Sequence, residues 1–412
     1  MNMHHEFAPI HVVYGGADRF KPDTPKKLAV ISAMFLKTYA SDEKEFSEAF
    51  EMDKPLAFIV RERVAKRLSG QAVQDFRADF EDGFGYRPSG EEDEAAIRLA
   101  AVVAEAMEAG SLSPKFGIRP KAPSAALFER SVRTTELFLN ALRERTEDLP
   151  SGFVITLPKI ESADQVAKYV EHVDRIEGQN GHKPGSICLE LMIETPQALV
   201  TSDGRDAIPM LVEACDGRCE SLHFGAYDFL SSVGIDDADF ELHHPLCDTA
   251  RQRMQLTGAP LGMRWCDGVT TTLPIEIHRG AELSDEQRAE NMESVHRGWR
   301  LAYNDIRQSM SMGFFQGWDV HPAQLVARYA AVYAASLEHA DGAAKRLANF
   351  LEQATRATSV GADFDDAATA NGLLNFFRRG MACGALTEDD LQSRGLDPHK
   401  IRAFDFAALV TE

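Results

Sequence analysis

The chain has 412 residues, of which 44% are hydrophobic and 26% are charged, as in an ordinary globular protein. Its 64 acidic and 44 basic side chains give a net charge of -20, and a field of that sign repels nucleic acid and anionic membranes. No run approaches the ~18 apolar residues of a membrane span, and the start, MNMHHEFAPI, does not resemble a signal peptide. We therefore expect a cytoplasmic protein whose partner is a small molecule, and neither nucleic acid nor a membrane.

Short apolar runs recur along the chain, and helical patterns separate most of them. The predicted strands cover residues 10–16, 73–82, 115–120, 152–162, 186–195, 221–229, 260–265 and 314–322. Helices are expected at 91–110, 124–145 and 162–176, where acidic residues or a capping serine mark helix starts. This alternation predicts a (β/α)8 (TIM) barrel. An open doubly wound sheet is the alternative, but VVYGGADRF, which includes the end of the first strand, lacks the glycine fingerprint of such sheets.

The pattern after the last predicted strand is helical to the end of the chain. We therefore expect two parts, a barrel over residues 1–325 and a helical C-terminal region over residues 326–412.

Charged residues stand at the ends of most predicted strands. In a barrel these ends, with the loops after them, form the catalytic face. The residues at these positions are Asp79, Glu81, Asp82, Arg119, Lys121, Lys159, Glu161, Glu194, Asp228, Asp319 and His321.

Glu194 and Asp228 follow neighbouring strands and form the predicted metal site. Mg²⁺ uses one or two protein carboxylates and keeps several waters, so this pair is sufficient, and Mn²⁺ is a second option. The segment GAYD offers the backbone amides of Ala226 and Tyr227 to a substrate carboxylate. A single acid at a strand end is more often a helix cap or a loop salt bridge, and this alternative weakens because several acids stand at successive strand ends. Arg119 has the alternative role of neutralising neighbouring acids.

Six short motifs resemble one superfamily, that of the citrate lyase β-subunit-like proteins and malate synthases. They are ADFEDGF (78–84), GIRP (117–120), LPKIES (157–162), MIET (192–195), HFGAYDFLSSVG (223–234) and DVHPAQL (319–325), in the order that the family has them. The resemblance implies that Glu194 and Asp228 bind Mg²⁺ in a barrel and that Arg119 is an active-site residue. A seventh segment, FDDAATANGLL (364–374), is similar to a malate synthase segment whose aspartate, here Asp366, is the catalytic base. A helix N-cap is the alternative role for Asp366.

The function that these residues favour is a Mg²⁺-dependent carbon–carbon lyase, of the aldolase or citrate lyase type, acting on a 2-oxo acid or its adduct. Arg119 would stabilise the negative charge that develops on the substrate. Three further side chains are expected to orient Arg119 and the waters on the metal, namely Glu81, Asp82 and Lys159.

Two alternatives stay open. One is a Claisen condensation of an acyl-CoA with a 2-oxo acid, in which a CoA thioester is a substrate. The other, of a different class, is a non-catalytic barrel that acts as a binding or regulatory subunit. In either enzyme the partner is a small carboxylic acid, and the sequence leaves open whether the chain forms a homo-oligomer.

Overall fold

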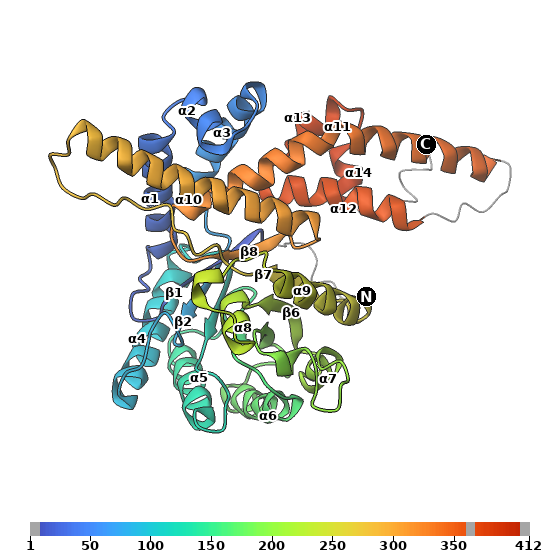
Figure 1. Ribbon diagram of the computed structural model, residues 1–412. Helices are drawn as coiled ribbons and strands as arrows, with labels where there is room; N and C mark the ends of the chain where they lie inside the picture. Colours follow the sequence, from blue (N-terminus) through green and yellow to red (C-terminus); the bar gives the residue numbers. More distant parts are fainter. Residues whose placement is uncertain (1–8, 360–366, 404–412) are drawn as a thin grey trace.

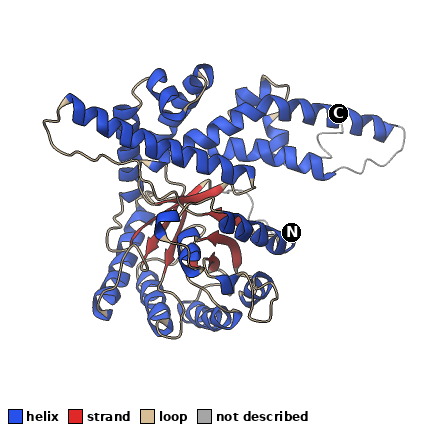
Figure 2. Ribbon diagram, viewed as in Figure 1, coloured by secondary structure: helices blue, strands red, loops and turns tan. Residues whose placement is uncertain are grey.

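Eight parallel strands close into a barrel in chain order (Figures 1 and 2). The computed structural model describes residues 9–359 and 367–403. The strands are β1 His11–Gly16, β2 Asp75–Asp79, β3 Lys115–Arg119, β4 Val154–Leu157, β5 Cys188–Ile193, β6 Cys219–Phe224, β7 Arg264–Asp267 and β8 Gln316–Asp319. β8 pairs with β1 and closes the sheet, with Val13 opposite Asp319. The predicted (β/α)8 barrel is therefore confirmed.

Helices surround the barrel and extend beyond it. They are α1 Thr24–Tyr39, α2 Glu43–Phe50, α3 Lys54–Leu68, α4 Ser89–Glu108, α5 Phe128–Arg143, α6 Ala163–Asn180, α7 Ile208–Ala214, α8 Ala226–Ser232, α9 Pro245–Gly258, α10 Asp285–Ser311, α11 Gln324–Ser359, α12 Ala367–Cys383, α13 Glu388–Gln392 and α14 Pro398–Ala403. Local sequence explains several ends. α6 starts at a capping box formed by Ser162 and Gln165 and stops at Gly181, whose φ is 68°. None of the described helices is long and apolar enough to cross a membrane.

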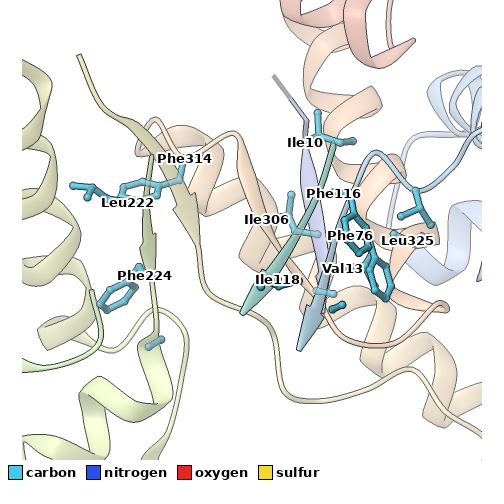
Figure 3. Packing of buried hydrophobic residues seen from close by; sticks show 14 of the residues in the cluster. Ile10, Val13, Phe76, Phe116, Ile118, Leu222, Phe224, Ile306, Phe314 and Leu325 are labelled. Carbon is cyan, nitrogen blue, oxygen red and sulfur yellow. The ribbon is translucent and has the colours of Figure 1, made fainter. Parts of the chain in front are cut away.

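Alternation along the strands separates a polar barrel interior from an apolar exterior. In β2 the sequence DFRAD turns Phe76 outward, where its ring lies 5.0 Å from that of Phe20 and 6.3 Å from that of Phe116 (Figure 3). The residues between the outward positions are charged and face the barrel axis. The same alternation turns Lys115 and Arg119 of β3 and Glu190 of β5 toward the inside of the barrel, at successive levels along its axis.

Four of these charges form a buried ion network, here called the interior network: Asp75, Arg77, Lys115 and Glu190. Arg77 Nη2 lies 2.7 Å from Glu190 Oε2 and 3.2 Å from Asp75 Oδ2, while Lys115 Nζ lies 2.9 Å from Glu190 Oε1. Arg77 and Asp75 are fully buried, so these pairs replace the hydration that the charges lose.

Most of the observed strands are shorter than their predicted ranges, and two of them differ for a clear local reason. The predicted strand 221–229 ends at Phe224, and Asp228 belongs instead to the first turn of α8. The strand expected at 260–265 is found at Arg264–Asp267, because Gly262 ends a 3-10 turn with φ 73°, which no strand residue adopts.

Two hydrophobic cores divide the C-terminal helices. The first part of α11, from Leu325 to Ala334, packs into the barrel core. Its later residues, from Ala340 to Leu347, pack with residues of α12, α13 and α14 into a second core. Figure 1 shows α11 and α12 leaving the barrel side by side. α11 runs through residue 325 without a break, so the domain boundary there stays a prediction.

Candidate metal and substrate site

Glu194 directly follows β5 at the barrel mouth and is 1% exposed. Its Oε1 accepts a hydrogen bond from the backbone N–H of Lys159 at 2.6 Å. Its Oε2 lies against Gly225, where a Cβ atom would come within 2.3 Å of it. The glycine before α8 therefore provides the space that the Glu194 carboxylate occupies.

Asp228 lies close enough to Glu194 for its negative charge to disfavour the ionised form of the Glu194 carboxyl group. Burial, and then the charge of Asp228, raise the pKa of Glu194 to about 8, against the opposing charges of Lys159 and Arg119. The Asp228 side chain is 43% exposed, so the pair opens to solvent on one side.

These donors fit a hard divalent cation that keeps water. Two neighbouring carboxylates repel each other less when a cation binds to both, and carboxylate oxygens are the donors that Mg²⁺ prefers. Within residues 9–359 and 367–403, no group of three or more His, Cys, Asp or Glu side chains forms a metal cage. The assignment of Glu194 and Asp228 as metal ligands therefore stays a prediction, in which Mg²⁺ would take its other ligands from water or substrate.

Arg119 ends β3 as a buried cation in a fixed orientation. Its Nε and Nη2 donate to Asp79 at 2.7 and 2.6 Å, and its guanidinium lies 4.9 Å from the ring of Tyr14 and 5.9 Å from that of Trp318. Its Nη1 has only long contacts, 3.7 Å to Met192 Sδ and 3.8 Å to a Glu81 oxygen. Arg119 therefore mainly neutralises Asp79, and Nη1 is the guanidinium nitrogen with the weakest partners.

Lys159 connects three acids of the mouth. Its Nζ lies 2.7 Å from Glu81 Oε1, 3.1 Å from Asp82 Oδ1 and 3.5 Å from Asp228 Oδ2. Burial would lower the pKa of Lys159, but the charges of Glu194 and Glu81 outweigh it and raise that pKa. Lys159 thus stays an ammonium ion.

Glu81 and Asp82 differ in proton affinity although they are adjacent. Burial, together with the hydrogen bond to the Asp82 carboxylate, raises the pKa of Glu81 to about 7. Burial acts in the same direction on Asp82, but the hydrogen bond with Glu81 and the charge of Arg119 prevail and lower its pKa to about 2. Such a divergence between neighbouring acids is typical of sites that handle protons.

The predicted metal, arginine and orienting residues therefore meet at the mouth, together with the backbone of Ala226 and Tyr227 in the first turn of α8. Other strand-end residues do not join them. Asp319 pairs with Arg328 at 3.1 Å, Lys121 donates to the Gly85 carbonyl, and Glu161 is exposed. Asp366 lies outside the described residues.

The sequence prediction assigned no role to Asp79, Tyr14, Met192 or Trp318, although all four contact Arg119. A signal for Asp79 was present, because residues 75, 77 and 79 alternate along β2 and all face the axis. Tyr14 and Trp318 come from β1 and β8, which meet only when the barrel closes. No local pattern reports that contact.

The fold and the mouth together define a (β/α)8-barrel protein with paired carboxylates and a clamped arginine at the carboxyl ends of its strands. The chain belongs to the family DUF6986, a domain of unknown function, whose model matches residues 4–409. No curated protein matches the sequence.

Solved structures with similar folds include two of malate synthase from Haloferax volcanii. The magnesium/glyoxylate complex is 15% identical, with a TM-score of 0.49 over 80% of this chain and 76% of that one. The pyruvate/acetyl-CoA ternary complex is 16% identical, with a TM-score of 0.46 over 66% of this chain. The match covers 64% of the malate synthase chain, which is less than two thirds of its length. An HpcH/HpaI aldolase from Desulfitobacterium hafniense DCB-2 is 14% identical, with a TM-score of 0.35 over 65% of this chain and 83% of that one.

Proposed function

We propose that the protein is a Mg²⁺-dependent enzyme that makes or breaks a carbon–carbon bond next to the carbonyl of a 2-oxo acid. The lyase direction, as in an aldolase or citrate lyase, is our first choice. The observation that supports this proposal is the pair Glu194 and Asp228 beside the clamped Arg119, in which burial and the charge of Asp228 raise the pKa of Glu194. A buried carboxylate such as that of Glu194 costs free energy when it is ionised, and a bound cation would lower that cost.

Glu194 and Asp228 would hold the metal. When bound, Mg²⁺ polarises the carbonyl of the substrate and neutralises the negative charge that develops on its oxygen. Mn²⁺ takes the same oxygen donors and is a second option.

Arg119 would stabilise that same developing charge. Asp79 fixes two of its nitrogens, so the guanidinium does not have to reorganise during the reaction. Nη1, which has only long contacts, is the donor best placed to reach a substrate oxygen. A preorganised donor of this kind is worth several kcal/mol in the transition state, about 3 kcal/mol in measured cases.

The first turn of α8 would receive the substrate carboxylate. The N–H groups of Ala226 and Tyr227 open this helix and therefore have no acceptor one turn earlier in it. Asp228 stands in the same turn, so a carboxylate bound there lies next to the proposed metal.

Proton transfer needs a group that changes charge near neutral pH. Glu81, whose pKa is raised to about 7, meets that requirement among the described acids, and Lys159 and Asp82 hold its position. Asp366, which the resemblance assigns as the base on a carbon acid, remains a prediction.

A Claisen condensation of a CoA thioester with a 2-oxo acid is the second candidate. The segment FDDAATANGLL favours it, because it is similar to the malate synthase segment that carries the base. Turnover that requires an added acyl-CoA would select this reaction over the aldolase.

The test is a Mg²⁺-supplemented screen of 2-oxo and 3-hydroxy acids, with and without CoA thioesters. We expect Glu194→Gln and Asp228→Asn to abolish the Mg²⁺-dependent turnover and to keep a native circular dichroism spectrum. Glu161→Gln, which changes an exposed acid near the end of β4, is the matched control and should keep full activity. Undiminished turnover in either metal-site variant would contradict the assignment.

A further inference from the structure

Lys159 directs both of its polar groups at the same set of acids. Its backbone N–H binds Glu194, and its ammonium group contacts Glu81, Asp82 and Asp228. One residue therefore reaches both proposed metal ligands and the two acids next to them. A positive charge held at this place competes with any other cation for the same oxygens.

The backbone of Lys159 is held in an unfavourable conformation to make these contacts. Its φ is 49°, in the left-handed region, which side chains other than glycine rarely adopt. A non-glycine residue persists there only when its surroundings fix it, and such residues cluster at functional sites. Glycine would relieve the strain, but it would also remove the ammonium group, so we infer that the charge is what this position requires.

We propose that Lys159 is the built-in counter-cation of the metal site, which neutralises Asp228 while Mg²⁺ is absent and lowers the affinity of the site for Mg²⁺. This inference rests on the metal assignment proposed above. The role differs from that of a ligand-orienting residue, because an orienting residue raises the affinity for Mg²⁺ and a counter-cation lowers it. The ammonium lies closer to Glu81 and Asp82 than to Asp228, so it can leave Asp228 and keep two partners. Release from Asp228 is then the step that metal uptake requires.

The two roles make opposite predictions for removal of the charge. If Lys159 orients the ligands, its loss weakens Mg²⁺ binding. If it is a counter-cation, its loss leaves Glu194, Asp228, Glu81 and Asp82 less neutralised, and Mg²⁺ binds more tightly. The hydrogen bond to Glu194 comes from the backbone, so Lys159→Met keeps it and isolates the contribution of the ammonium group.

The experiment is an isothermal titration of the intact protein with MgCl₂, without substrate. We expect Lys159→Met to lower Kd on the order of tenfold, which corresponds to about 1.4 kcal/mol. Lys159→Arg, which keeps the charge, should stay near the wild type. Lys168→Met, which changes an exposed lysine paired with Asp164 on α6, is the matched control for net charge. An unchanged or higher Kd for Lys159→Met would overturn the inference.

Thermal unfolding gives an independent readout. Without metal, Lys159→Met should melt at a lower temperature than the wild type, and saturating Mg²⁺ should remove that difference. Lys159→Gln repeats both measurements with a polar side chain of similar length, in case the methionine variant folds poorly. If the wild type binds no Mg²⁺ at millimolar concentration, the metal assignment itself fails. If the wild type binds Mg²⁺ and neither neutral variant binds it more tightly, only the counter-cation role fails.

Discussion

At Gly225 a missing side chain determines where a carboxylate lies. The chain turns there from β6 into α8, and Glu194 Oε2 occupies the space in which any other residue would place its Cβ. A methyl group at this position would come within 2.3 Å of that oxygen, far inside van der Waals contact, so one of the two groups has to move. The geometry of the proposed metal site thus depends on a residue that supplies no ligand.

We predict that Gly225→Ala weakens Mg²⁺ binding by at least about tenfold, because the added methyl group displaces the Glu194 carboxylate. Isothermal titration with MgCl₂ measures this change. Gly178→Ala is the matched control, since a Cβ at that position in α6 meets nothing within 4 Å. Equal affinities in the two variants would mean that Glu194 does not bind the metal.

At the level of single residues, the sequence predicted the charged residues of the candidate site but not several of the side chains that contact them. Glu194, Asp228, Arg119 and Lys159 stand in recognisable motifs directly after strands. The clamp on Arg119 from Asp79 and the aromatic rings of Tyr14 and Trp318 depends on register across several strands. Spacing along the chain carries little of that information.

The strands themselves follow a pattern in which polar residues face the axis and apolar ones face the helices. In β2 the outward positions, Phe76 and Ala78, meet the helical layer, and the inward positions carry charge. The sequence predicted these elements because runs such as DFRAD and KFGIR are short and bounded. It did not predict the inward pairing, because ion pairs such as Arg77 with Glu190 join residues 113 positions apart. Strand β7 was displaced in the prediction because the turn at Gly262 was not recognised.

We predict that Arg77→Met destabilises the protein by on the order of 3–5 kcal/mol, since it leaves Asp75 and Glu190 buried with less neutralising charge. Urea unfolding followed by circular dichroism provides the measurement. Arg205→Met removes an arginine from an exposed pair with Asp203 and should leave the unfolding midpoint unchanged. If both variants unfold at the wild-type midpoint, the interior network does not stabilise the fold.

On the scale of the whole molecule, the C-terminal helices have a core of their own. Leu374 in α12 and Leu347 in α11 are fully buried in it, apart from the barrel core. Contacts between the two parts include Arg63 of α3, which lies 2.8 Å from Asp390 of α13. The helical extension was expected from the sequence, whereas its separate core follows from contacts between helices that no single periodicity describes.

We predict that Leu374→Ala destabilises the C-terminal helices by about 2–5 kcal/mol and leaves Mg²⁺ affinity unchanged, because the cavity forms away from the mouth. Hydrogen exchange followed by mass spectrometry should show faster exchange only in the second core, that is in the later part of α11 and in α12, α13 and α14. Leu189→Ala, in β5, makes the same truncation in the barrel core and should instead affect the strands. Faster exchange throughout the barrel in Leu374→Ala would show that the two cores unfold together.

The interior network also constrains how this protein can diverge. Its four charged residues come from three strands and neutralise one another, and Lys115 also pairs with Glu220, so a single replacement leaves a buried charge with fewer partners. Replacing the charged residues one at a time would destabilise the protein at each step. An apolar layer can therefore evolve here only if the paired residues are replaced together. Descendants of a common ancestor should then either keep all four residues or replace them as a group. The residues of the interior network should in that case differ less between related proteins than the residues of the mouth, because the partly exposed mouth residues can change one at a time.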